Sequence, residues 1–201
     1  MMRLLPAILC LLLAAGCGSA TSTPANGPRA PLDVSHDLPP TEAGAKAALE
    51  EFAKPNAEML KLLAQLKPTR TELEVIYQPA YVEKALAAEE KLWFATLKQG
   101  GLRFEKEQTQ VLLHRATTRE LAAWGADTAR DFSDSHAPER FKRVALYVND
   151  GLTFYRFRFV KPGLAYGAVF DALLTHANGR WVLIQNPVRV IERYDEIMAY
   201  K

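Results

Sequence analysis

Hydrophobic residues recur at intervals of three and four between residues 41 and 66, which is typical of amphipathic helices. Thr41 suits the cap of a first helix that reaches Phe52. Pro55 suits the first turn of a second helix, and Pro68 ends it. The pattern therefore predicts two short helices at the start of the folded region.

A longer helical pattern follows. Thr71 and Glu74 have the spacing of a capping box, in which each side chain bonds the other residue's backbone N–H. Hydrophobic residues at helical spacing then predict a long helix over residues 79–99. Gly100 and Gly101 supply its stop, since glycine adopts the left-handed conformation that ends many helices.

Short runs typical of strands replace the helical pattern after residue 110. Strands are expected over 110–116, 152–160, 166–176 and 180–186, whereas 141–148 fits a helix or a strand. The fold class predicted is therefore α+β, with N-terminal helices packed on a curved antiparallel sheet.

Two turns fix the predicted register of the last strands. Asn178-Gly179 predicts a type I′ turn, which places His176 opposite Trp181. Pro162-Gly163 suits a two-residue type II turn, which places Phe159 opposite Tyr166.

This register divides the strands into two faces. The first face is aromatic and nearly uncharged, and it should pack against the helices. It carries Tyr155, Phe157, Phe159, Tyr166, Phe170, Leu174, His176, Trp181 and Leu183. The second mixes charges with aliphatic residues, and it carries Phe154, Arg156, Arg158, Val160, Val169, Asp171, Leu173, Val182, Ile184 and Asn186. Such a face predicts an interface, for a homodimer or an envelope protein, through Arg156, Arg158, Asp171 and Leu173. Alternatively, the N-terminal helices or residues 141–148 cover it.

The closing strands resemble the last meander of cystatin-like, nuclear transport factor two-like domains. The resemblance rests on Phe154-Tyr155-Arg156-Phe157, Lys161-Pro162-Gly163 and Asn178-Gly179-Arg180-Trp181-Val182. It implies a cone-shaped pocket between helices and sheet, in a superfamily that includes isomerases, dehydratases and non-catalytic binding domains. No catalytic residue of that superfamily maps onto this chain, so the resemblance implies a fold and not an activity.

The N-terminus has the pattern of an export signal. Arg3 precedes a hydrophobic stretch over residues 4–15, which is too short to span a bilayer. Leu13-Ala14-Ala15-Gly16-Cys17 resembles the lipobox of bacterial lipoproteins, although Ala14 stands where leucine is usual. The resemblance implies cleavage before Cys17 and its acylation. Plain secretion with cleavage after Ala20 is the alternative.

These features predict three segments: a signal peptide over 1–16, a lipidated cysteine with a flexible tether over 17–40, and one domain over 41–201. The predicted location is the cell envelope, with lipid on Cys17 in the membrane. By resemblance to the sorting rule of bacteria with two membranes, Gly18 points to the outer membrane.

Composition removes several classes of function. A formal net charge of +2 gives no basic footprint for nucleic acid. The two cysteines are Cys10, within the signal, and Cys17, so a lipidated mature chain has no free thiol for redox or nucleophilic chemistry. Phosphate-binding, serine-hydrolase and zinc-protease motifs are absent from the sequence, and no cofactor is expected.

The candidate pocket residues are Tyr155, Tyr166 and His176, which share the first face. His176 is either a satisfied histidine of the core rim or an acid–base group, and His114 has the same two interpretations. Asp131, Asp134 and His136 match no metal-site spacing and are expected in a solvated loop. The adjacent glutamates at 50–51 and 89–90 are expected to be solvated.

The sequence thus favours a membrane-anchored lipoprotein with a non-catalytic domain that binds a ligand or a protein. A small-molecule isomerase or hydrolase that uses the cone-shaped pocket is the alternative. A structural assembly subunit is a third class.

Overall fold

A computed structural model describes residues 32–123 and 137–199. Its five strands form one antiparallel sheet in the order β1-β2-β4-β5, and β3 also pairs with β2. The strands are β1 (Gln110–Thr117), β2 (Thr153–Val160), β3 (Gly167–Val169), β4 (Ala172–Ala177) and β5 (Arg180–Gln185). Helices that precede the sheet and follow it make the domain α+β, as the sequence predicts.

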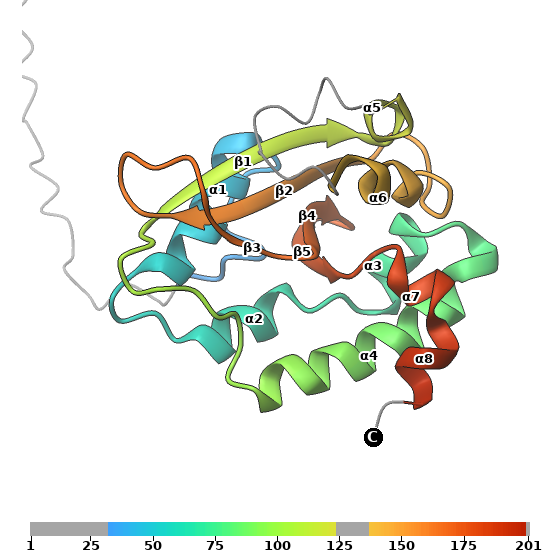
Figure 1. The fold of residues 1–201 in the computed structure, drawn as a ribbon. Coiled ribbons are helices and arrows are strands. Elements are labelled where there is room, and N and C mark those ends of the chain that lie inside the picture. Colours follow the sequence, from blue (N-terminus) through green and yellow to red (C-terminus); the bar gives the residue numbers. More distant parts are fainter. Residues whose placement is uncertain (1–31, 124–136, 200–201) are drawn as a thin grey trace, which may run out of the picture. The chain divides into compact units, whose positions relative to one another are not determined.

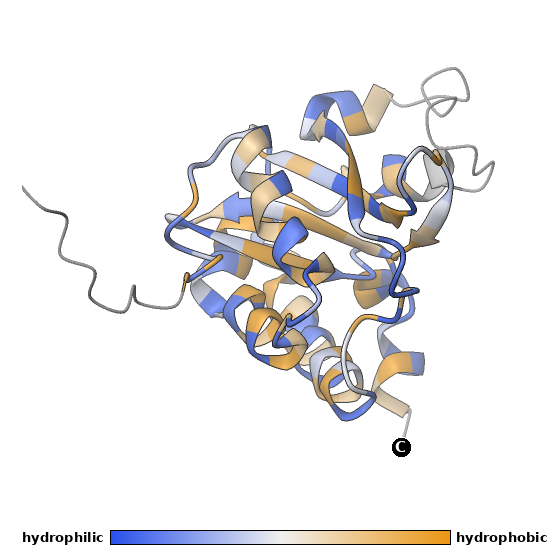
Figure 2. Cartoon of the chain, turned by 90° about the vertical axis from the view of Figure 1, so that its left-hand side faces the viewer, coloured by the Kyte–Doolittle hydropathy of each residue, from blue (hydrophilic) through white to orange (hydrophobic). Residues whose placement is uncertain are grey.

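Helices flank this sheet, and α4 runs along the side of the domain opposite β1 (Figure 1). The helices before β1 are α1 (Glu42–Glu50), η1 (Glu51–Ala53), α2 (Met59–Leu66), α3 (Arg70–Ile76), η2 (Pro79–Tyr81) and α4 (Val82–Lys98). Those after β1 are α5 (Thr118–Ala123), α6 (Ala137–Val144), α7 (Arg189–Glu192) and α8 (Tyr194–Ala199). Hydrophobic and hydrophilic residues share the same helices (Figure 2), which is typical of helices with one face in a core.

Two helix starts differ from the prediction. Thr41 caps α1 as expected, and its hydroxyl accepts a hydrogen bond from the Gly44 N–H. However, α2 begins at Met59 and not near Pro55, because residues 54–58 form turns first. The capping box of α3 uses Thr69 and Glu72, two residues earlier than predicted. The Glu72 carboxylate accepts both the Thr69 N–H at 2.8 Å and its hydroxyl at 2.6 Å, which satisfies the first turn.

The Asn178-Gly179 turn is confirmed. Both residues have positive φ, 50° and 79°, and His176 pairs with Trp181. The Pro162-Gly163 turn is longer than predicted, so that Phe159 pairs with Ala168 and not with Tyr166. Because this slip is two residues, every side chain keeps its predicted face.

The predicted strand over 166–176 is divided into β3 and β4. Phe170 and Asp171 interrupt it, and the partner of β2 shifts between Arg158, which pairs with Val169, and Tyr155, which pairs with Leu174. Gly167 allows β3 to lie close to β2, since a Cβ there would lie 2.1 Å from the Phe159 carbonyl oxygen. The interruption bends the sheet without exchanging its two faces.

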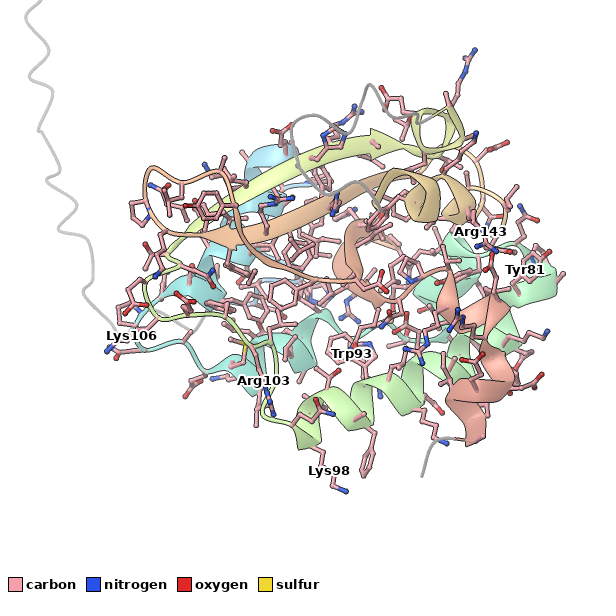
Figure 3. The ribbon with its side chains drawn as sticks, in the orientation of Figure 1. Tyr81, Trp93, Lys98, Arg103, Lys106 and Arg143 are labelled. Atoms are coloured by element: carbon pink, nitrogen blue, oxygen red, sulfur yellow. The ribbon has the colours of Figure 1, made fainter. Side chains whose placement is uncertain are left out.

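The first face forms an aromatic core, as predicted. Its buried members meet residues of α1 and α2 together with Trp93 of α4. Phe157 stacks on Phe170 at 5.6 Å between ring centroids, and Phe159 stacks on Phe104 at 4.2 Å. Figure 3 shows Trp93 between α4 and the sheet, whereas Lys98 points away from the domain.

Most of the second face is covered, although Val169 is 41% exposed, so the expectation of an exposed interface through Arg156, Arg158 and Leu173 is wrong. Residues 141–148 begin as the end of α6, and the Arg156 guanidinium lies 5.0 Å from the Phe141 ring centre. Leu173 is 1% exposed and packs in a second core with residues of α3, α4 and α6. Arg158 is also buried and donates a hydrogen bond to the Ala165 carbonyl, and Asp171 is half-buried.

The folded unit begins at Leu32, earlier than the predicted boundary at residue 41. Val34 and Ser35 are buried, and the Ser35 carbonyl accepts the Trp181 backbone N–H at 2.8 Å. The Leu38 carbonyl accepts the indole N–H of Trp181 at 3.2 Å. The prolines and polar residues of this segment hid its role, although Val34 and Leu38 pack into the aromatic core. Cys17 and the predicted signal over residues 1–16 lie outside the described residues.

Candidate functional site: a cleft at one end of the sheet

The space between the helices and the first face is filled by side chains. Phe157, Phe159 and Trp181 are fully buried there. The cone-shaped interior pocket implied by the resemblance is therefore replaced by packed aromatic rings in this part of the domain.

A cleft of about 440 Å³ opens instead at the end of the sheet where β1 and β4 finish and β2 and β5 begin. Its walls are Pro40, Thr41, Glu42, Arg115, Gly151, Leu152, Thr153, Tyr155, His176 and Trp181. Strand pairing explains why these distant residues meet: Arg115 pairs with Tyr155, and His176 pairs with Trp181. The start of α1 contributes Glu42.

Tyr155 is the buried polar group of the cleft, with 4% of its surface exposed. Burial raises the pKa of its hydroxyl, the Arg115 guanidinium lowers it, and the Glu42 carboxylate raises it. The net pKa lies above the ordinary value, so the hydroxyl is protonated at neutral pH and can donate a hydrogen bond.

His176 is half-buried, and its ring meets Trp181 edge to face at 5.2 Å between centroids. Burial lowers the pKa of His176, so its imidazole is neutral near pH 7 and presents one donor and one acceptor. Trp181 also meets Tyr155 edge to face at 5.7 Å, so that its ring packs against both Tyr155 and His176.

Arg115 and Glu42 place opposite charges on the walls of the cleft, and both are exposed. The Arg115 Nη1 atom lies 3.7 Å from Glu120 Oε2, which is longer than a charge-assisted hydrogen bond. That same Glu120 oxygen accepts the Thr117 N–H at 2.7 Å and the Thr117 hydroxyl at 2.8 Å. These two hydrogen bonds lower the pKa of Glu120 and engage its carboxylate away from the cleft.

The structure brings together two of the three predicted pocket residues. Tyr155 and His176 line the cleft, but Tyr166 lies at the opposite end of the sheet and is 67% exposed. Tyr166 borders a second groove of about 820 Å³, together with Phe104 and Lys161. The longer turn between β2 and β3 carries Tyr166 away from the position expected for it.

His114, another candidate from the sequence, does not line the cleft. His114 lies on the second face, where it pairs with Arg156. Asp131, Asp134 and His136 lie outside the described residues. Within residues 32–123 and 137–199, no group of three or more histidine, cysteine, aspartate or glutamate side chains could hold a metal ion. No helix in the same ranges is long and apolar enough to cross a bilayer.

Glu89 is a buried carboxyl group that the sequence did not reveal. The prediction that it is solvated is wrong, since Glu89 is 1% exposed. Its Oε1 atom accepts the backbone N–H of Gln185 at 2.9 Å, on the outer side of β5. Burial raises the pKa of Glu89 well above its ordinary value, more than the Gln185 hydrogen bond, Trp93 and Lys67 lower it. Glu89 is therefore a structural group and does not line the cleft.

Comparison of the chain with protein-family models, with curated proteins and with solved structures gives no match in any of the three.

Proposed function

We propose that the chain is a lipid-anchored protein of the cell envelope whose domain binds a small polar ligand in the cleft. The cleft carries the proposal, because strands far apart in sequence converge there to present Arg115, Tyr155 and His176 around one opening. Its volume of about 440 Å³ lies within the range of about 300–1,000 Å³ typical of small-molecule sites. The buried Trp181 and Tyr155 rings, packed against each other at the opening, support a binding surface that is formed before the ligand arrives.

The anchor is proposed from the sequence at Cys17. Its resemblance to a lipobox supports acylation, and the short hydrophobic stretch before it supports a cleaved signal. Lipid on Cys17 would hold the domain at a membrane, with the 14 residues 18–31 between the lipid and the start of the folded unit. In a bacterium with two membranes, Gly18 favours the outer one.

Binding is favoured over catalysis because no residue in 32–123 or 137–199 orients the His176 ring by a hydrogen bond. A histidine base usually has a carboxylate or carbonyl that fixes its ring. In the described part of the chain no carboxylate hydrogen-bonds to His176, and burial is what lowers its pKa. The isomerase or hydrolase remains the second candidate, because a neutral imidazole and a protonated Tyr155 hydroxyl share the cleft and could act as base and acid.

Ligand screening by NMR tests the proposed function. The full chain in detergent would be mixed with a panel of small carboxylates, amines, amino acids and sugars, while the ring protons of His176 are followed. A ligand of the cleft should move these resonances, and His176→Gln should weaken its binding about tenfold or more. Lys161→Gln, in the second groove, is the control and should leave the affinity unchanged. A ligand that binds the control and His176→Gln equally well would contradict the assignment of the cleft.

A further inference from the structure

We propose that the cleft selects a zwitterionic ligand, namely a free amino acid or a short peptide whose carboxylate meets Arg115 and whose ammonium group meets Glu42. This inference rests on the proposed function, because it names the ligand class of the same cleft. It is carried by the placement of one exposed cation and one exposed anion on separate elements that face one opening.

The cationic side is Arg115 of β1. A guanidinium can hold a carboxylate through two parallel hydrogen bonds, which gives both affinity and orientation. Glu120 competes only weakly with a ligand for the Arg115 guanidinium. Its Oε2 atom lies 3.7 Å from Arg115 Nη1, and the same oxygen accepts two hydrogen bonds from Thr117. The Tyr155 hydroxyl, which hydrogen-bonds to Arg115 and is protonated at neutral pH, adds a donor to the same cleft.

The anionic side is Glu42 at the first position of α1. No ion pair within the described ranges uses Glu42, so its carboxylate can accept an ammonium group from a ligand. Thr41 already caps the helix through its own hydroxyl, which leaves Glu42 without that task. Both the Arg115 guanidinium and the Glu42 carboxylate lie near enough to the Tyr155 hydroxyl to shift its pKa, in opposite directions.

Opposite charges around one opening discriminate between ligand classes. A simple carboxylate gains the Arg115 contact but is repelled by Glu42. A simple amine gains the Glu42 contact but is repelled by Arg115. A zwitterion satisfies both groups at once. Leu152 and the half-buried His176 ring leave a mixed surface for the ligand's side chain. The modest volume favours one or two residues over a longer peptide.

Isothermal titration of the full chain in detergent with the twenty L-amino acids and L-alanyl-L-alanine tests this inference. The tightest binder would then be compared with its amide, which lacks the carboxylate, and its N-acetyl derivative, which lacks the ammonium group. We expect each derivative to bind at least tenfold more weakly.

Variants assign each end of the ligand. Arg115→Gln should abolish the preference over the amide and keep the preference over the N-acetyl derivative, and Glu42→Gln should do the opposite. Lys161→Gln and Glu105→Gln form the matched control, since these residues make an ion pair of 2.7 Å at the second groove. Neither control should change any preference. Circular dichroism of each variant establishes that it folds.

The possible failures are distinguishable. If the derivatives bind as tightly as the parent amino acid and still move the His176 resonances, the cleft is a binding site but the zwitterion inference is wrong. The same conclusion follows if sugars or simple carboxylates move His176 and no amino acid does. If no probe of any class moves His176, the inference and the proposed function both fail.

Discussion

Glu89→Gln is expected to change how the stability of the domain depends on pH. The native carboxyl is fully buried and its pKa is raised, chiefly by loss of hydration. In the unfolded chain the same group ionises near its ordinary pKa of about 4.3. Between this pH and the native pKa, the folded protein holds one proton more than the unfolded protein. The contribution of Glu89 to the free energy of unfolding must therefore fall as pH rises through this window.

The magnitude follows from the proton count. A difference of one bound proton changes the free energy of unfolding by about 1.4 kcal/mol for each pH unit. Glutamine keeps an oxygen that can accept the Gln185 N–H but has no proton to lose, so its variant lacks this slope. Relative to the parent, Glu89→Gln should gain about 1.4 kcal/mol per pH unit above the unfolded pKa, until the native group ionises. Below that pH the two proteins should run parallel.

Urea unfolding of the parent and the variant at half-unit pH intervals measures this difference directly. Both proteins share their other titratable groups, including the buried Tyr77 hydroxyl near Glu89 and Lys67. The contributions of these groups to the free energy of unfolding largely cancel when the two proteins are compared. Glu90→Gln is the matched control, because Glu90 is the next residue along α4 and is exposed. If the difference between Glu89→Gln and the parent does not vary with pH, Glu89 is not a buried neutral acid and the reasoning is refuted.

Three further changes have definite expected outcomes. Cys17→Ser should release the protein from membranes or leave the precursor uncleaved, and normal fractionation and processing of this variant would contradict lipid anchoring. Phe157→Ala should cost about 3–5 kcal/mol of unfolding free energy, because Phe157 is fully buried among aromatic rings, and a melting shift of only a degree or two would disagree. Gly167→Ala should destabilise the β2–β3 pair, since its Cβ would meet the Phe159 carbonyl oxygen, whereas Gly163→Ala has open space and only its positive φ to resist it. Thermal unfolding compares the two glycine variants, and equal effects would show that the close approach is unimportant.

Turn chemistry explains why the sequence predicted the faces of the sheet. Asn178-Gly179 is a local signal with one favoured geometry, so the pairing of His176 with Trp181 could be derived without tertiary information. The Pro162-Gly163 turn was predicted too short, but the error of two residues left each side chain on its own face. Tyr155 and His176 were therefore placed together correctly, while Tyr166 was not.

Long-range packing explains what the sequence did not predict. Arg115 joins the cleft only because β1 pairs with β2 across an intervening segment of 35 residues, for which no turn signal fixes the register. Covering of the second face depends on where α6 docks, which a local pattern does not specify. Both Glu89 and Glu90 were expected in solvent as charged residues of a helix, but α4 lies along β5, so that Glu89 is buried and Glu90 is exposed.

The contacts along β5 bear on how the protein behaves at high local concentration. β5 ends the strand order of the sheet, and an open strand edge can recruit the edge of another molecule and begin aggregation. Here the Ser35 carbonyl occupies the Trp181 N–H and the Glu89 carboxyl occupies the Gln185 N–H. If lipid anchors the chain as proposed, molecules crowded onto a two-dimensional membrane surface would meet one another often. These two contacts leave fewer backbone donors along β5 for a neighbouring strand.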